Sequence, residues 1–225
     1  MSKEINKLAY FSELLTDKKD FSYDDWFYKI AETLMNHLCL EVGKTRYRIT
    51  ECEIYYNDGK NHIDPYIHGE EEQLTLGNLY FNRAGGLDIT FGNSNIEPKI
   101  KGGILLRGLN KIATTEYINQ ITKITSEVFR GLGNIIKEEK SIALKEFPIQ
   151  NKIVEKPTIT TRVGLEKKEN DKEGYISKNY RFIIDSLNPE NEYALKSKIL
   201  RKLFWDGKIT EAEILKNINY IPRTQ

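Results

Sequence analysis

The sequence predicts an α+β protein with a curved, mainly antiparallel β-core surrounded by helices. Three observations lead to this fold class: apolar residues recur at helical spacing before residue 44, a period of two begins at Thr45, and paired helix signals follow residue 186. We therefore expect an α+β unit over residues 1–185 and a C-terminal helical hairpin over residues 186–225.

The first 44 residues are expected to be helical. Ser22 is a typical N-cap, and Asp25 places a negative charge in the first turn that follows. The apolar residues then recur every four positions, which predicts one buried helix face: Trp26, Ile30, Leu34 and Leu38. Gly43 is expected to end this helix.

From Thr45 the side chains alternate between the two faces of a predicted strand. Glu51, Glu53 and Tyr55 share one face, which is unusual because two carboxylates stand among β-forming residues. Residues 57–59 (NDG) indicate a turn, and residues 57–86 are predicted to form a long irregular connection.

The rest of the chain alternates between short strand and helix patterns. Strands are predicted at residues 87–91, 103–109, 158–165 and 175–185, and a helix at 111–146 that is interrupted near Gly131. Two helices at 189–204 and 210–218 would form the C-terminal hairpin, the second beginning with a capping box of Thr210 and Glu213.

Composition excludes several classes of protein. With 39% hydrophobic and 30% charged residues the chain is not intrinsically disordered, and no apolar run is long enough to span a bilayer. Residues 1–5 lack the features of a secretory signal, and Cys39 and Cys52 are too few for a disulfide framework, so we expect a cytoplasmic protein. No Cys/His cluster has the spacing of a zinc site. The net charge of +1 requires any nucleic-acid-binding face to be local; Lys99, Lys101 and Lys111 form a modest basic cluster.

Several segments resemble, in order, the motifs of the alkyladenine (3-methyladenine) DNA glycosylase family. The strand ITECEIY at residues 49–55 is similar to that family's I-V-E-T-E-A-Y strand. Further resemblances keep the family's order, so that the likeness extends over roughly residues 30–185: TLGN at 75–78, LDITFG at 87–92, GILLRGL at 103–109, TRVGL at 161–165 and YRF at 180–182.

The resemblance implies a role for five residues. Glu53 falls on the water-activating glutamate and Tyr55 on the aromatic residue that stacks on the flipped base. His62 falls close to a pocket histidine, Arg107 on the pocket arginine, and Phe91 on the tyrosine that wedges into the DNA stack. The implied fold is that of the glycosylase, and no metal or organic cofactor is implied.

Two further acids are left open by the residues themselves. Glu51 either shares the pocket with Glu53 or pairs with a lysine or arginine. Asp88 stands where the family has a second pocket tyrosine. A carboxylate does not stack on a base but accepts hydrogen bonds from its edge, so Asp88 predicts a different target base or else faces solvent. Arg107 interrupts an apolar strand and must be paired, either with a ligand or with Glu51 or Glu53.

Three functions are consistent with these features. The first is a monofunctional DNA glycosylase that hydrolyses the N-glycosidic bond of a flipped, modified base in double-stranded DNA, with Glu53 activating water. The second is a non-catalytic protein that binds a free nucleotide or base on the same scaffold, which the weak net charge and Asp88 favour. The third is an interaction module, including a homo-oligomer, built around the C-terminal hairpin. None of them involves a membrane.

Overall fold

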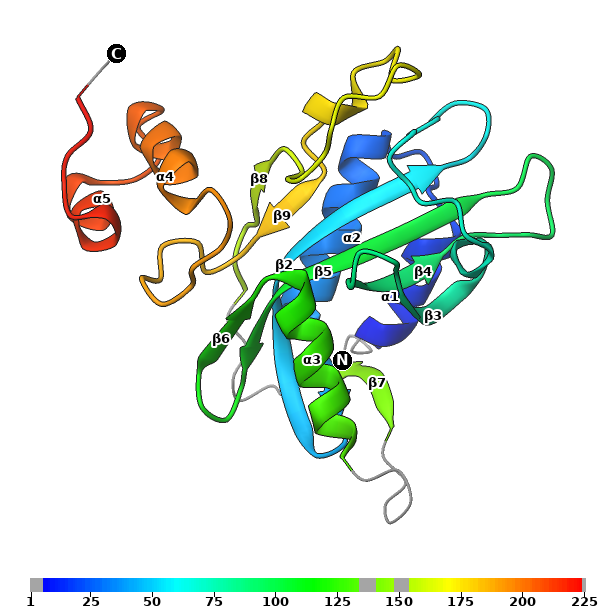
Figure 1. Cartoon of the computed structure of the whole chain (residues 1–225), viewed down its shortest axis with the longest axis horizontal. Coiled ribbons are helices and arrows are strands. Elements are labelled where there is room, and N and C mark those ends of the chain that lie inside the picture. Colours follow the sequence, from blue (N-terminus) through cyan, green and yellow to red (C-terminus); the bar gives the residue numbers. More distant parts are fainter. Residues whose placement is uncertain (1–5, 134–140, 148–153, 224–225) are drawn as a thin grey trace, which may run out of the picture.

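The computed structural model describes residues 6–133, 141–147 and 154–223. In this part of the chain, a curled antiparallel sheet forms half of a barrel, with helices on both of its faces (Figure 1). Its main path runs in the order β3-β4-β5-β2-β1-β7; β6 pairs with β5, and β9 joins β2 to β8. The α+β class with a curved antiparallel core is therefore confirmed.

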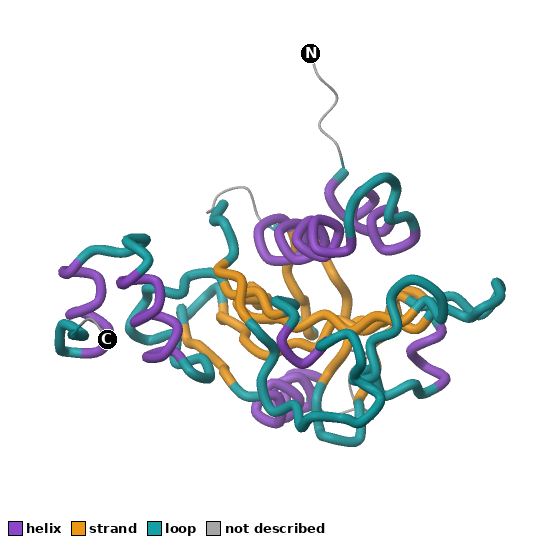
Figure 2. The backbone as a smooth tube through the Cα atoms, turned by 90° about the horizontal axis from the view of Figure 1, so that it is seen from above, coloured by secondary structure: helices purple, strands orange, loops and turns teal. Residues whose placement is uncertain are grey.

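Three helices sandwich this sheet. The helices α1 (Lys7–Thr16) and α2 (Tyr23–His37) lie on one face and α3 (Ile121–Leu132) lies on the other, as the view from above shows (Figure 2). The main-chain N–H of Asp25 donates to the Ser22 hydroxyl at 3.1 Å, which confirms the predicted cap of α2. The prediction that the helix continues to residue 44 was wrong. It ends at His37 because the next five residues form β1, four of which pair with the following strand.

The strands are more numerous than the sequence predicted, and the two predicted at 158–165 and 175–185 are shorter, at Thr158–Thr160 and Arg181–Ile183. The segment expected to be irregular holds a short 3-10 helix, η1 (Glu71–Leu74), and β3. The region expected to be one broken helix contains β6, α3 and β7, with residues 134–140 outside the described part. The bounds are β1 Leu38–Val42, β2 Thr45–Asn57, β3 Leu76–Phe81, β4 Leu87–Phe91, β5 Lys101–Lys111, β6 Glu116–Asn119, β7 Ile142–Glu146, β8 Thr158–Thr160 and β9 Arg181–Ile183, with a second 3-10 turn, η3, at Tyr175–Ser177.

The two central strands, β2 and β5, pair irregularly near their middle. Glu51 lies opposite Gly108 while its neighbour Cys52 lies opposite Leu106, so Arg107 is an extra residue on β5. Glycine is needed at position 108, because a Cβ there would lie 2.7 Å from the Thr50 hydroxyl. Such bulges re-aim side chains and are common beside functional sites.

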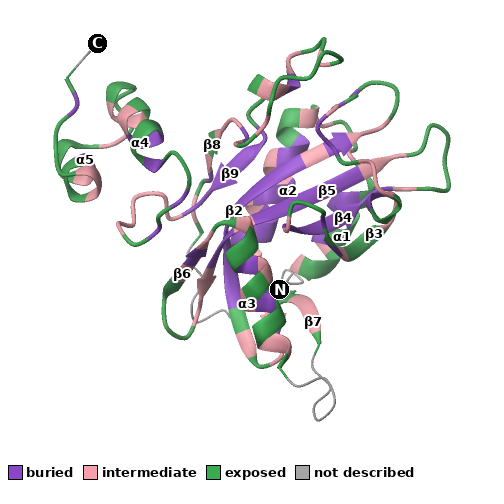
Figure 3. Ribbon diagram, in the orientation of Figure 1, coloured by how far each residue is buried: buried purple, intermediate pink, exposed green. Residues whose placement is uncertain are grey.

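The C-terminal hairpin consists of α4 (Lys196–Trp205) and α5 (Glu211–Ile218). The first helix begins seven residues later than residue 189, where the sequence predicted it, but the capping box at Thr210 and Glu213 is confirmed. The hairpin has its own small apolar cluster of Ile183, Tyr193, Ile199 and Leu203, and it is far more exposed than the central strands (Figure 3). Within the described ranges, no helix is both long and apolar enough to cross a membrane.

Candidate functional site

The two faces of β2 have opposite characters. On one face Cys52 contacts the sulfur of Met35 in α2, so Glu51, Glu53 and Tyr55 point away from that helix. This second face carries both glutamates of β2, and α3 contacts it at the end where Tyr47 donates a hydrogen bond to Glu127. The alternation in the sequence therefore correctly placed the two glutamates and the tyrosine together.

Glu53 is fully buried, and each of its carboxylate oxygens accepts a hydrogen bond. Oε1 accepts from the main-chain N–H of Val163 at 2.9 Å, and Oε2 accepts from the Tyr55 hydroxyl at 2.8 Å. The Nε of Arg107 lies 3.4 Å from Oε1. Burial nevertheless raises the pKa of Glu53 above its usual range, because the loss of hydration outweighs the stabilisation by Arg107 and the two donors.

Glu51 is held between two guanidinium groups. Its Oε1 accepts from the Nε of Arg107 at 3.0 Å and from the Nε of Arg181 at 2.8 Å. The ion-pairing alternative left open for Glu51 is therefore met, and Arg107 links its carboxylate to that of Glu53. Two carboxylates and two guanidiniums buried together cost desolvation energy. Such an arrangement is more typical of functional sites than of cores.

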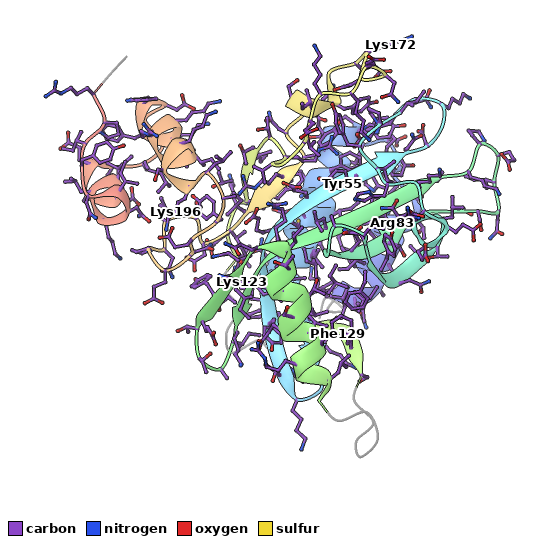
Figure 4. All side chains as sticks on the ribbon, in the orientation of Figure 1. Tyr55, Arg83, Lys123, Phe129, Lys172 and Lys196 are labelled. Carbon is purple, nitrogen blue, oxygen red and sulfur yellow. The ribbon has the colours of Figure 1, made fainter. Side chains whose placement is uncertain are left out.

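Tyr55 is half-buried, and one face of its ring is occupied. The guanidinium carbon of Arg162 lies 4.4 Å from the ring centroid, at a distance typical of cation–π contacts. Arg162 is itself buried and forms an ion pair with Asp64. Tyr55, labelled in Figure 4, thus has two partners in the site. Its hydroxyl donates a hydrogen bond to Glu53, and one face of its ring contacts Arg162.

Asp88 lies on the same face as Glu53, two strands away. It pairs with Leu105 on β5, and Leu105 pairs in turn with Glu53. The carboxyl is buried, and desolvation raises its pKa to about 7, a shift that the neighbouring charge of Glu53 increases. Its polar neighbours are the side-chain amides of Asn82 and Gln73. Asp88 therefore does not face solvent.

Leu105 lies between the two acids in the register, and a glycine lies two residues before it on the same strand, beside the Gln73 amide. Gly103 lies opposite Tyr55, and a Cβ there would lie 3.1 Å from the Gln73 amide nitrogen and 3.6 Å from Asp88 Oδ2. With no side chain at this position, the Asp88 carboxyl and the Tyr55 ring flank the same stretch of the sheet.

The structure does not bring His62 to Glu53. The imidazole lies on the α2 side of β2, where its ring contacts Tyr23 and Phe27. Nδ1 is 2.9 Å from the Tyr56 carbonyl oxygen and Nε2 is 3.0 Å from the Tyr180 hydroxyl, so both nitrogens are engaged within the protein. Burial lowers the pKa of His62 and favours the neutral ring.

Phe91 is part of the hydrophobic core. It is 2% exposed, with its ring stacked on Tyr56 and edge-on to Trp26. A ring in this position cannot enter a base stack without leaving the core, so the wedge role expected for Phe91 has no support in its placement.

Several residues of the site were missed as site residues, although some stood in the quoted motifs. Arg162 and Val163 come from TRVGL and Arg181 from YRF, and these segments reach Glu53 because β9 pairs with β2. Asn82 and Gln73 had no sequence signal, because their contact with Asp88 depends on how η1 and β3 fold back. The predicted lysine cluster does not join the site; Lys111 instead lies 3.6 Å from Glu127 of α3. Among the described residues, no group of three or more His, Cys, Asp or Glu side chains is arranged to hold a metal ion.

No family model matches the chain. A protein of Acanthamoeba polyphaga mimivirus, named uncharacterized protein L759, is 32% identical over 139 residues, an alignment that covers 51% of this chain and 64% of the viral protein. The chain thus spans less than two thirds of the length of this relative.

Proposed function

We propose that the protein hydrolyses the N-glycosidic bond of a modified base in DNA, on the fold of the alkyladenine DNA glycosylases. The observation that carries the proposal is the fully buried Glu53 carboxylate, held by Arg107 and the Val163 N–H beside the half-buried ring of Tyr55. A base turned out of the helix would stack on the face of the Tyr55 ring opposite Arg162 once that face is free. Its sugar would then lie close to Glu53.

The reaction needs one proton acceptor and benefits from one proton donor. Glu53 takes a proton from water as the water oxygen bonds to C1′, and the electron pair of the breaking C1′–N bond passes to the base. Tyr55 must first release Oε2, because its hydroxyl occupies the position that the water needs. Asp88, whose pKa is about 7, is partly protonated at neutral pH and donates a proton to the departing base.

The spacing of the two acids suits this division of roles. They lie on one face and are separated by two strand spacings, roughly 9.5 Å between their backbones. Leu105 lies between them in the register, so the glycosidic bond would have to lie above the Leu105 side chain, with the water on the Glu53 side.

The test is release of bases from a panel of duplexes that carry alkylated, deaminated or hypermodified bases, read out as alkali-labile abasic sites. We expect release by the wild-type protein and at least a 100-fold slower rate with Glu53→Gln. Glu72→Gln, which changes an exposed glutamate outside the site, is the matched control and should keep the wild-type rate. Equal release by the wild type and Glu53→Gln would remove Glu53 from its role.

The charge of the leaving base tests Asp88 separately. Hypoxanthine is neutral while bound to the sugar, so it leaves as an anion unless it receives a proton, whereas 7-methylguanine is cationic while bound and leaves as a neutral base without one. We therefore expect Asp88→Asn to slow release of hypoxanthine at least 10-fold more than release of 7-methylguanine, within the range of general acid catalysis. An equal loss with both bases would contradict proton donation by Asp88.

One observation favours a second function, the binding of a nucleotide or base without catalysis. Both oxygens of Glu53 are already hydrogen-bonded within the protein and the side chain is sealed from water. If this arrangement persists with ligand bound, the same site recognises a base but does not cleave it. Saturable binding of a nucleotide without release of any base from the duplex panel would select this function.

A further inference from the structure

A cavity lies on the far side of β9 from β2, outside the site around Glu53. It has a volume of about 730 Å³, within the range of ligand-binding pockets, and is lined by β8 and by α4 with the turn that follows it. We call it the α4 cavity. Figure 1 shows that β8 is the strand of the sheet on the side of the hairpin.

The lining of the α4 cavity is strongly positive. Four cationic side chains contribute to it, Lys198, Arg201, Lys202 and Lys208, against the single carboxylate of Asp206. Lys198 and Lys202 are exposed and lie one helical turn apart, a like-charge spacing that disfavours a helix by a few tenths of a kcal/mol. Neither has an ion-pair partner within the described part of the chain. This charge is therefore available to an anionic ligand.

An aromatic ring stands beside these cations. Trp205 lies three residues after Lys202, lines the same cavity and is 40% exposed. Thr160 and Thr161 add side-chain hydroxyls from the opposite wall. Cations, hydroxyls and an exposed aromatic face together are the features by which proteins bind a nucleic-acid strand, with the phosphates on the cations and a base on the ring. A second copy of the chain is a poor occupant, because it would bring the two sets of cations together.

The register of the sheet connects this cavity to the first site. Thr160 pairs with Arg181, and Arg181 pairs with Glu53, so the three side chains share one face. Thr160 thus lies roughly 9.5 Å from Glu53, two strand spacings away. That distance corresponds to about three nucleotides of a stacked strand.

We propose that the α4 cavity binds the backbone and one unstacked base of a DNA strand that continues from the Glu53 site. The position of the strand rests on the proposed function, but the nucleic-acid binding itself rests on the cavity alone. A DNA-binding face of this kind is local, as the net charge of +1 requires.

Tryptophan fluorescence of the full-length protein tests the proposal directly. Trp26 is buried, so quenching on addition of an oligothymidylate reports on Trp205. We expect saturable quenching, and a Kd at least 10-fold weaker in Lys198→Glu/Lys202→Glu. The slope of log K against log salt should become shallower by about 1.4 for the two lost phosphate contacts.

The matched control is Lys44→Glu/Lys172→Glu, which makes the same change of charge at two exposed lysines away from the cavity; Lys172 lies on a loop remote from α4 (Figure 4). It should keep the wild-type Kd within about threefold. Trp205→Ala, followed by anisotropy of a labelled oligonucleotide, should weaken binding at least fivefold. If Lys198→Glu/Lys202→Glu loses α-helical circular dichroism, the charge is tested with Lys202→Gln alone. We expect that variant to have at least a twofold weaker Kd.

Two results would overturn the proposal: equal weakening by both lysine double variants, or quenching of Trp205 by polyglutamate as strong as by oligothymidylate. The second result would make the ligand an acidic polypeptide. The binding assay does not depend on base release. A negative binding result therefore does not affect the test of Glu53, and a negative base-release result does not affect the test of the α4 cavity.

Discussion

The buried acids Glu53 and Asp88 share one face of the sheet, but their neighbours affect the pKa of each differently. Glu53 has a guanidinium and two hydrogen-bond donors close to its carboxylate, and these oppose the effect of burial on its pKa. Asp88 has only the neutral amides of Asn82 and Gln73, and the charge of Glu53 acts against its ionisation. Asp88 is therefore partly protonated near neutral pH, whereas the charged form of Glu53 has stabilising partners that Asp88 lacks.

The raised pKa of Asp88 makes stability depend on pH. Between about pH 4 and pH 7 the folded protein keeps a proton on Asp88 that the unfolded chain has lost, so the wild type loses stability as pH rises through this window. Relative to the wild type, Asp88→Asn should gain up to about 4 kcal/mol in unfolding free energy between these limits. Urea unfolding of both proteins at four pH values measures the difference. A difference that stays constant with pH would show that Asp88 ionises normally.

At the level of the elements, alternation in the sequence was sufficient to predict β2 and the shared face of Glu53 and Tyr55. It was not sufficient to end α2, because Leu38 continues the helical spacing of apolar residues and is equally suited to a buried strand. The bulge at Arg107 also had no local signal, since it arises from pairing with a strand more than fifty residues away. Long-range pairing of this kind is invisible to a local pattern.

The capping box of α5 is a local device and should have a local effect. Thr210→Ala removes the acceptor for the Glu213 N–H, which lies 3.2 Å from the hydroxyl, and should cost the helix about 1 kcal/mol. Amide hydrogen exchange should then be about fivefold faster in α5. Glu211→Ala, which removes an acid from the same turn without touching the box, should change exchange by less than half as much. Equal acceleration in both variants would assign the effect to charge rather than to capping.

At the scale of the molecule, the site is assembled from both ends of the main domain. The strand with Glu53 comes early in the chain, whereas Arg162, Val163 and Arg181 arrive more than a hundred residues later. Motif resemblance placed these segments in order but assigned no role to the three residues, because their contacts exist only once β9 lies against β2. His62 is the opposite case. It is close to Glu53 and Tyr55 along the chain, but its ring bonds to the Tyr56 carbonyl oxygen and lies on the other face of the sheet.

The ion pair between Arg162 and Asp64 links the early and the late segments of the chain that form the site. Both side chains are fully buried, and Arg162 also donates to the carbonyl oxygens of Ile54 and Tyr175 at 3.2 and 3.0 Å. Removing one charge leaves the other uncompensated in the interior, so Asp64→Asn should lower the unfolding free energy by about 3–5 kcal/mol.

Glu32→Gln is the matched control for that variant. It breaks the partly exposed pair with Lys29, at 2.9 Å, and should cost less than about 1 kcal/mol. Urea denaturation measures both variants against the wild type. The double variant Asp64→Leu/Arg162→Met should be less destabilised than Asp64→Asn, because it leaves no unpaired charge behind. If instead the double variant is the less stable of the two, the packing of Arg162 against Tyr55, rather than its charge pairing with Asp64, holds the two halves of the site together.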